Sequence, residues 1–227
     1  MGTLYLVRHG QASFGADDYD QLSVRGQQQC ERLGAYWRER GLRFDAVLCG
    51  TLRRHAQTLA GIVQGLGDQG GPLPEPLLLP RLNEYDSQAL IRAIHPARLP
   101  RPDTPELFRQ YFRLLCDALA QWMAGTISPA GMPSWLDFCD GVRAALEQVR
   151  REHAGGKVLL VSSGGPIAAA VGAVLCTPPE VTIALNMRLR NSAVTEFSVS
   201  PKRLMLQTFN TLPHLDAPEL AGWVTHA

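Results

Sequence analysis

The feature that most constrains the fold is an apolar run from Lys157 to Val161 that leads through Ser162-Ser163-Gly164-Gly165-Pro166 into a second apolar segment near residues 167 to 175. A strand that is apolar on both faces must be covered on both, which is typical of parallel sheets. Proline suits the first turn of a helix because its missing N–H is not needed there. The segment therefore predicts a strand, a tight turn and a helix, within an α/β fold that has helices on both faces of a sheet.

Other segments extend this pattern. The Thr3 to Val7 run is short, apolar and β-prone, and it ends at the charged Arg8. Ser23 is a suitable N-cap for a helix over residues 24–40, which Gly41 would end. Thr51 is a suitable N-cap for a second helix, which would run to the glycine-rich break at 65–71. Further strands are expected near 46–49, 77–79, 193–199 and 204–209, and further helices near 105–124 and 135–153. This order predicts a three-layer α/β/α sandwich with a mostly parallel, doubly wound sheet.

The chain is expected to form a single domain over residues 1–227, because no linker rich in glycine, serine or charge divides it. Four prolines between residues 96 and 105 exclude long regular structure there, and we expect a helical, lid-type insertion at about 85–140. These prolines are Pro96, Pro100, Pro102 and Pro105. The oligomeric state is not indicated by any feature of the sequence.

Composition excludes several classes of partner. Hydrophobic residues make up 45% of the chain and charged residues 19%, and the net charge is +1, so we expect a soluble protein that binds neither nucleic acid nor a membrane. Its five cysteines are scattered without a metal-ligand spacing, which predicts reduced thiols, a cytoplasmic location and no metal site. Any binding of anions must therefore be local.

Three of the predicted strands or turns end in residues suited to an anion. They are Arg8-His9-Gly10, Thr51-Leu52-Arg53-Arg54 and Ser162-Ser163-Gly164-Gly165. In open α/β sheets the ligand lies at the carboxyl ends of the strands. Two arginines in the first turn of a helix oppose the helix dipole, so an anion is expected to compensate them. The free N–H groups that follow Ser163 suit a phosphate, and the guanidinium of Arg8 can bind phosphoryl oxygens in a bidentate manner.

His9 would lie inside this phosphate pocket. An imidazole nitrogen held in line with a phosphorus atom can attack it and form a phosphohistidine. The neighbouring arginines would lower the pKa of His9 and keep the attacking nitrogen unprotonated. The alternative is that Arg-His-Gly is an ordinary surface turn.

These motifs resemble those of the histidine phosphatase superfamily, the group that includes cofactor-dependent phosphoglycerate mutase. The matching segments are Leu6-Val7-Arg8-His9-Gly10-Gln11, Tyr19-Asp20-Gln21-Leu22-Ser23-Val24-Arg25-Gly26, Thr51-Leu52-Arg53-Arg54-His55-Ala56-Gln57-Thr58 and Leu82-Asn83-Glu84. The third resembles the family's L-x-R-A-x-x-T pattern with His55 in place of Ala, which selects Arg54 rather than Arg53 as the phosphate ligand. The resemblance implies that His9 is the nucleophile, that Glu84 is the proton donor and that no cofactor is needed.

One position departs from the family pattern. The family has a second histidine in a V-S-H-G-G segment, and this chain has Ser163 at that position. Serine can still donate a hydrogen bond to the phosphoryl group, but the loss of one preorganised donor costs about 3 kcal/mol, or roughly a hundred- to thousand-fold in rate. We expect a slower or specialised phosphomonoesterase, with a catalytically silent binder of phosphorylated ligands as the alternative. On this argument, Ser163→His should raise the rate.

Several residues keep two interpretations. Ser13 and Gly164 are candidates for binding phosphate, although Ser13 could equally face water. Asp86 competes with Glu84 as the acid, and His214 would either replace the missing histidine or pack in the tail. A helical stripe that is expected to be core, with a substrate cleft as the alternative, consists of Phe108, Tyr111, Phe112, Leu115, Leu119 and Trp122.

The partner is expected to be a small phosphorylated substrate or phosphate, of unspecified identity. A mutase is less favoured, because Gln11-Ala12-Ser13-Phe14-Gly15 differs from the E-S-x-W-N continuation of the glycolytic mutases. A dinucleotide enzyme would need a G-x-G-x-x-G turn, which the segment at 164–166 does not provide.

Overall fold

The computed structural model describes residues 1–13, 20–97, 99–100 and 104–226. In these parts, six strands form one sheet in the order β3-β2-β4-β1-β5-β6. The strands are β1 (Gly2–Arg8), β2 (Ala46–Cys49), β3 (Leu77–Leu78), β4 (Lys157–Ser162), β5 (Val194–Val199) and β6 (Leu204–Thr211). The first four are parallel, whereas β5 runs antiparallel to both β1 and β6. The predicted α/β sandwich is confirmed, with a mixed sheet in which β5 runs in the direction opposite to the other five described strands.

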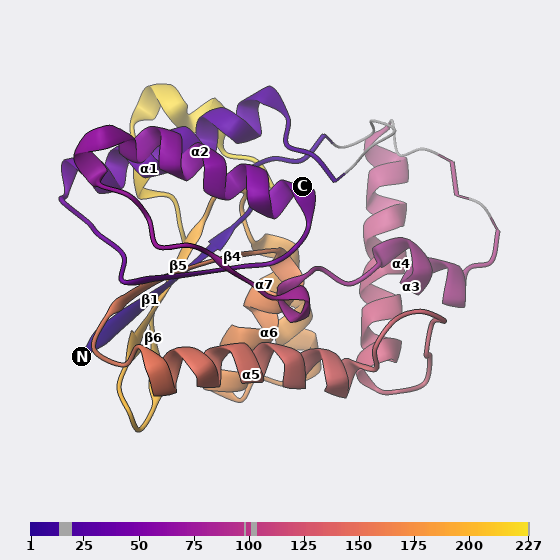
Figure 1. The fold of residues 1–227 in the computed structure, drawn as a ribbon. Coiled ribbons are helices and arrows are strands. Elements are labelled where there is room, and N and C mark those ends of the chain that lie inside the picture. Colours follow the sequence, from indigo (N-terminus) through magenta and orange to yellow (C-terminus); the bar gives the residue numbers. More distant parts are fainter. Residues whose placement is uncertain (14–19, 98, 101–103, 227) are drawn as a thin grey trace.

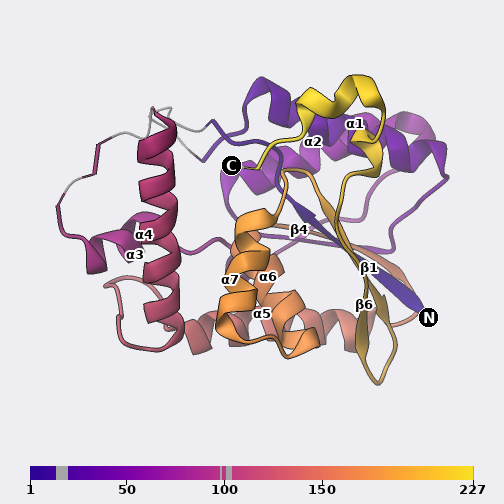
Figure 2. The same cartoon turned by 180° about the vertical axis from the view of Figure 1, so that it is seen from behind.

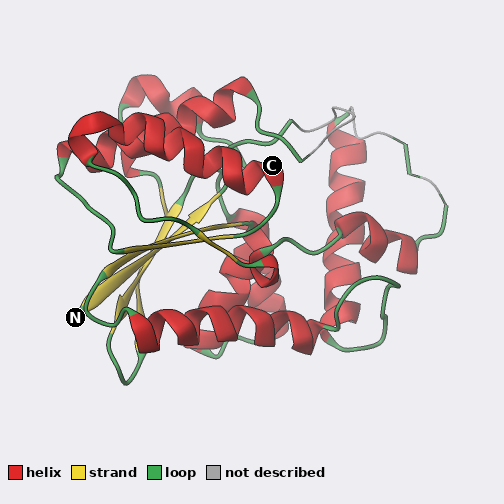
Figure 3. Ribbon diagram, in the orientation of Figure 1, coloured by secondary structure: helices red, strands yellow, loops and turns green. Residues whose placement is uncertain are grey.

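Helices cover both faces of this sheet (Figures 1 and 3). One face packs against α1 (Val24–Glu39) and α2 (Arg53–Gly70), and the other against α5 (Trp135–Glu152) and α6 (Gly164–Leu175). A further helix, α7 (Pro179–Arg188), lies beside α6, as Figure 2 shows from behind.

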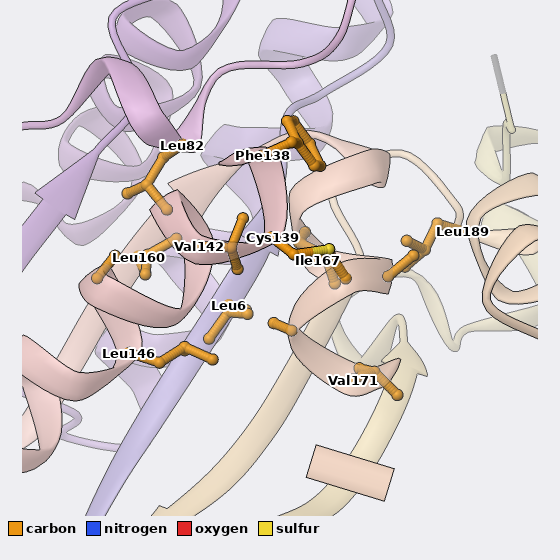
Figure 4. Close-up of a cluster of buried hydrophobic side chains, with 14 of the residues drawn as sticks. Leu6, Leu82, Phe138, Cys139, Val142, Leu146, Leu160, Ile167, Val171 and Leu189 are labelled. Atoms are coloured by element: carbon orange, nitrogen blue, oxygen red, sulfur yellow. The ribbon is translucent and has the colours of Figure 1, made fainter. Parts of the chain in front are cut away.

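The central strands alternate their side chains between two cores, as a side-chain period of two requires. Leu6 and Leu160 point to the core beneath α5 and α6, where Val142, Leu146 and Ile167 meet them (Figure 4). Val7, Leu159 and Val161 point to the core beneath α1 and α2. Because both cores hold β1 and β4 at the centre of the sheet, the ends of these strands are fixed in space.

The predicted insertion contains α3 (Ser87–Ile94) and α4 (Pro105–Met123). Both stand at one side of the molecule, opposite the N-terminus and on the side toward which β1 runs (Figures 1 and 2). In the helical stripe, Leu115, Leu119 and Trp122 are buried and belong to the core, while the three aromatic residues nearer the start of α4 are only partly buried. A lid function for this segment stays a prediction, and Pro102 and the Phe14-Gly15 pair lie outside the described residues.

Helix ends test the predicted caps. Ser23 accepts a hydrogen bond from Gly26 N–H (3.1 Å), and Gly41 follows the C-cap with a φ of 60°, so both predictions for α1 are confirmed. The prediction that Thr51 caps α2 is wrong, because α2 begins after Leu52 and the Thr51 hydroxyl accepts instead from Asn83 (2.7 Å). The helix also extends into the predicted break at 65–71, as far as Gly70, with non-helical dihedrals at Gly67.

The remaining differences concern short helices. The helix after β4 begins at Gly164, three residues earlier than predicted, and neither α3 nor α7 was predicted. Among the described residues, no helix combines the length and the apolar character that crossing a membrane requires.

Candidate functional site

The turns that follow β1, β2 and β4 meet at the carboxyl end of the sheet. In the sheet, Arg8 pairs with Ser162 and Cys49 pairs with Val161. The N–H of His9 donates to Ser162 O (2.9 Å), and the N–H of Gly50 donates to Val161 O (3.0 Å). The three predicted clusters are therefore neighbours at one edge.

The His9 ring is fixed in one orientation and one tautomer. Its side chain is buried, and its Nδ1 lies 2.8 Å from the carbonyl oxygen of Gly10. A carbonyl oxygen only accepts, so Nδ1 must carry the proton and donate it, which leaves the Nε2 lone pair bare. A Cβ at Gly10 would overlap the carbonyl oxygen of Gly26, so glycine is required for this turn to approach α1.

The electrostatic surroundings keep this ring neutral. Burial lowers the pKa of His9 well below its ordinary value, and the charges of Arg8 and Arg54 and the nearby ring of His55 lower this pKa further. At neutral pH, a nitrogen with an available lone pair therefore lies beside two guanidinium groups. The expected effect of the arginines on His9 is present, although burial is the larger cause.

Arg54, and not Arg53, belongs to this site. Its side chain is buried, whereas Arg53 is exposed. Nη1 of Arg54 donates to Asp20 Oδ1 (2.8 Å), and the backbone N–H of Arg53 donates to Asp20 Oδ2 (2.9 Å). Asp20 is thus an anion of the kind expected for a helix that begins with two arginines, and it orients the Arg54 side chain.

Arg8 is also buried at the end of β1. Its Nη1 donates to the carbonyl oxygens of Leu189 and His226, so the C-terminal segment is bound to this guanidinium. A guanidinium has five N–H donors, of which Nη1 carries two. The described tail is held further by Thr225, whose carbonyl oxygen accepts from the Asn191 N–H (2.8 Å).

Ser163 lies between two side chains of α2. Its Oγ is 2.7 Å from Nε2 of His55 and accepts at 3.4 Å from Nη2 of Arg54. His55 is completely buried, and the centroid of its ring is 5.9 Å from that of His9. In the sequence, His55 stands out only as a substitution in the motif, and no part in the site is predicted for it. The signal that could have found it is the joint departure of positions 55 and 163 from the family pattern.

Glu84 reaches the site from the segment after β3. Both of its carboxylate oxygens lie 3.1 Å from the N–H of Gly165, at the start of α6. Burial raises the pKa of the Glu84 carboxyl above its ordinary value, and this effect outweighs the lowering by Arg54, the Gly165 N–H and Arg8. The competing Asp86 instead caps α3, where it accepts from Ala89 N–H (2.9 Å).

This contact changes the expectation for Gly164 and Gly165. The sequence suggested that their N–H groups await a phosphate, but a protein carboxylate already accepts from Gly165. A Cβ at Gly165 would overlap Oε1 of Glu84, so glycine at this position makes room for the carboxylate. Gly164 is buried beside it and stays a candidate for contact with phosphate.

Two predicted residues make no direct hydrogen bond to the side chains of this group within the described chain. The N–H of Ser13 donates to Gln21 O (2.8 Å), which fixes its backbone in the loop after His9. His214 lies in a short 3₁₀ turn (Pro213–Leu215), and its Nε2 is 2.9 Å from Ser192 Oγ. Its pairing with Ser192 supports the interpretation of His214 as a packed tail residue.

The described residues contain no group of three or more histidine, cysteine, aspartate or glutamate side chains that could hold a metal ion. The arrangement instead offers one nucleophilic nitrogen, two cations, a hydroxyl and a carboxyl group of raised pKa. These are the components that phosphoryl transfer to a side chain needs.

Comparison with known proteins gives a family model and similar solved structures. The model of the histidine phosphatase superfamily (branch 1) matches residues 4–212. No curated protein matches the chain. Among solved structures, a mutant phosphoserine phosphatase from Entamoeba histolytica in complex with phosphoserine is similar, at 18% identity and a TM-score of 0.62, over 95% of this chain and 100% of that one.

Two other solved structures share the fold. The alpha-ribazole phosphatase from Shigella flexneri is 19% identical with a TM-score of 0.64, over 92% of this chain and 96% of that one. A phosphoglycerate mutase from Bacillus anthracis str. Sterne is 17% identical with a TM-score of 0.65, over 93% of this chain and 94% of that one. At these identities, the likeness concerns the fold alone.

Proposed function

Because this chain belongs to the histidine phosphatase superfamily, we propose that it is a metal-independent phosphomonoesterase that acts through a phosphohistidine on His9. The observation that carries the proposal is the 2.8 Å contact between His9 Nδ1 and the carbonyl oxygen of Gly10. The Nδ1–H group donates a hydrogen bond to Gly10 O, so Nε2, which keeps its lone pair, is the nitrogen that can attack phosphorus.

The proposed reaction has two steps. Nε2 of His9 attacks the phosphorus atom, the bond from phosphorus to the ester oxygen breaks, and protonated Glu84 gives its proton to that oxygen. Glu84 then takes a proton from water, the water oxygen attacks phosphorus, and the P–N bond breaks to release phosphate and neutral His9. The raised pKa of Glu84 supports this role, since the acid must hold its proton at working pH.

The phosphoryl oxygens are proposed to bind Arg8, Arg54, Ser163 and Gly164, with Ser13 as a further contact from the loop after His9. Two buried guanidinium groups are well suited to the charge that develops on the phosphoryl group in transfer. The substrate is proposed to be a small phosphomonoester. Similar folds bind such ligands, as the phosphoserine complex illustrates.

Hydrolysis of 4-nitrophenyl phosphate in the presence of EDTA tests this function. We expect turnover by the wild-type protein, a loss of more than about a thousand-fold in His9→Ala, and a covalent phosphoenzyme that is labile in acid and stable in base. Arg53→Ala, at the exposed neighbour of Arg54, is the matched control and should keep its activity. Equal rates in the wild type and His9→Ala would contradict the proposal.

A second candidate is a catalytically silent binder of phosphorylated ligands. It is favoured by the serine at position 163 and by the contacts of Arg8 with Leu189 and His226. It predicts saturable binding of phosphate esters that weakens in Arg8→Ala, without turnover of any ester tested. Turnover that depends on His9 would exclude it.

A further inference from the structure

We infer that His55 acts through Ser163: its Nε2–H holds the Ser163 hydroxyl so that the hydroxyl hydrogen is donated to the bound phosphoryl group. Ser163 is the residue that touches the ligand, and His55 is a positioning residue. The inference deepens the proposed function and rests on its placement of a phosphoryl group at this site.

The first support is that Ser163 does not serve the helix that it precedes. Serine at an N-cap usually accepts a hydrogen bond from the backbone of the first turn. Ser163 is the N-cap residue of α6 but makes no such bond, and the Glu84 carboxylate accepts from Gly165 N–H instead. The hydroxyl of Ser163 is thus turned toward α2, where His55 and Arg54 contact it.

The second support is the count of donors and acceptors at Ser163. A hydroxyl has one hydrogen to donate and two lone pairs that accept. Arg54 only donates, so it occupies one lone pair. If His55 Nε2 also donates, both lone pairs are filled, and the hydroxyl hydrogen must be donated to another acceptor. A phosphoryl oxygen between Arg54 and His9 would be that acceptor.

The tautomer of His55 decides whether this count holds. Within the described chain, Nδ1 of His55 is buried and has no hydrogen-bond partner. A buried N–H group without an acceptor is rare in proteins, and an unmet acceptor is tolerated better. This places the proton on Nε2, which faces Ser163 Oγ at 2.7 Å.

The third support is that the surrounding backbone accommodates this ring. A Cβ at Gly50, the residue after β2, would overlap Nδ1 of His55, and Gly50 has no positive φ that would otherwise require glycine. His55 has no exposed surface, and burying a polar ring costs free energy unless one of its nitrogens makes a hydrogen bond. The turn after β2 thus leaves space for an imidazole that holds Ser163.

Binding of orthovanadate, measured by titration calorimetry, tests the inference without requiring turnover. Ser163→Ala and His55→Leu should each weaken binding by roughly ten- to hundred-fold, the usual effect of losing a hydrogen bond to a charged group. The double variant should bind vanadate no more than about threefold more weakly than whichever single variant binds it less tightly. The reason is that either single change already removes the same hydrogen bond to the ligand. His55→Gln keeps an N–H donor and should stay within about threefold of the wild type.

Thermal unfolding of each variant separates these effects from damage to the fold, and Arg53→Ala is the control, at an exposed residue. Should His55→Leu fail to fold, the histidine NMR measurement described below tests the inference in its place. The inference is overturned if the wild type binds no vanadate or if His55→Leu binds it as tightly as the wild type. It is also overturned if the loss of affinity in the double variant equals the product of the fold-losses in Ser163→Ala and His55→Leu. If the variants lose vanadate affinity as expected but the wild type does not hydrolyse 4-nitrophenyl phosphate, the proposed function is wrong and the inference still holds.

Nitrogen-15 NMR of protein labelled at histidine gives an independent answer. We expect the proton of His55 on Nε2, and a changed Nε2 shift in Ser163→Ala. A proton on Nδ1 would mean that Ser163 donates to His55, which leaves no hydrogen for the phosphoryl group and overturns the inference.

Discussion

At the scale of single residues, position 163 cannot be understood without position 55. From the sequence alone, Ser163→His should restore a missing donor. The structure argues against this for the single change, because Ser163 has no exposed surface and His55 Nε2 lies 2.7 Å from its Oγ. An imidazole at 163 would need the space that the His55 ring fills, and overpacking a buried site costs typically 1–3 kcal/mol.

The double variant His55→Ala with Ser163→His is therefore the informative one. We expect Ser163→His alone to lower both the melting temperature and kcat, and His55→Ala together with Ser163→His to recover both, because removing one ring makes space for the other. Steady-state kinetics on 4-nitrophenyl phosphate and thermal unfolding would measure this. A single Ser163→His variant that is faster than the wild type and equally stable would refute it.

The titration of His9 and Glu84 predicts a bell-shaped pH profile of kcat/KM. The pKa of His9 lies below its ordinary value, so the nucleophile is lost only when pH falls below that lowered pKa. The pKa of Glu84 lies above its ordinary value, so the acid is lost as pH rises through that raised pKa. Each limb should change kcat/KM by about tenfold per pH unit, since one proton is involved.

Glu84→Gln should remove the alkaline limb and should slow phenyl phosphate more than 4-nitrophenyl phosphate, because the poorer leaving group needs the proton more. Profiles of the two esters over pH 4 to 9 would measure this. The same alkaline limb in Glu84→Gln would assign it to another group.

At the scale of elements, the start of α6 couples a helix to the proposed acid. A Cβ at Gly165 would overlap Glu84 Oε1 and lie 2.6 Å from an atom of the Tyr85 ring, so Gly165→Ala must displace the carboxylate. We expect kcat/KM for phenyl phosphate to fall by about a hundred-fold, the lower end of what general acid catalysis contributes. Gly155→Ala, where a Cβ would meet no atom within 4 Å, is the control. An unchanged rate in Gly165→Ala would mean that Glu84 does not act from this position.

The elements themselves differ in how well the sequence predicts them. The strand β4 and the helices α1 and α5 were predicted to within a few residues, because their apolar spacing and caps are local signals. The short helices α3 and α7 were missed, and the start of α2 was assigned to the wrong cap. The segment that supplies its acceptors is distant in sequence, since Asp20 accepts from the backbone of Arg53.

The site shows the same division. The sequence brings out Arg8, His9 and Arg54 because each lies at the end of a strand or in the first turn of a helix. Local patterns in the sequence do not place Glu84 beside Gly165 or His55 beside Ser163, because these contacts join residues 81 and 108 positions apart. Such pairs depend on the register of the sheet and on how α2 packs over β4.

At the scale of the whole molecule, three buried histidines should make the fold sensitive to acid. Burial lowers the pKa of His55 and of His214 to about 3, and lowers that of His9 well below its ordinary value. Below about pH 6.5 the unfolded chain binds a proton at each of these residues, while the folded protein does not. The contribution of these histidines to the free energy of unfolding is therefore complete above pH 6.5. It is lost as pH falls toward their folded pKa values, by about 1.4 kcal/mol per pH unit for each histidine.

Glu84 opposes this loss, because its folded pKa is raised and the folded state gains a proton before the unfolded state does. With three histidines against one carboxyl, the sum still favours unfolding in acid. Urea unfolding at intervals from pH 8 to pH 5.5 should give a falling free energy of unfolding below pH 6.5. The slope should be shallower in His55→Gln and in His214→Gln, because each variant lacks one buried histidine. Equal stability at pH 7.5 and pH 5.5 would mean that the buried rings take up protons in the folded state, and the neutral His9 on which the proposed attack depends would then be lost over that range.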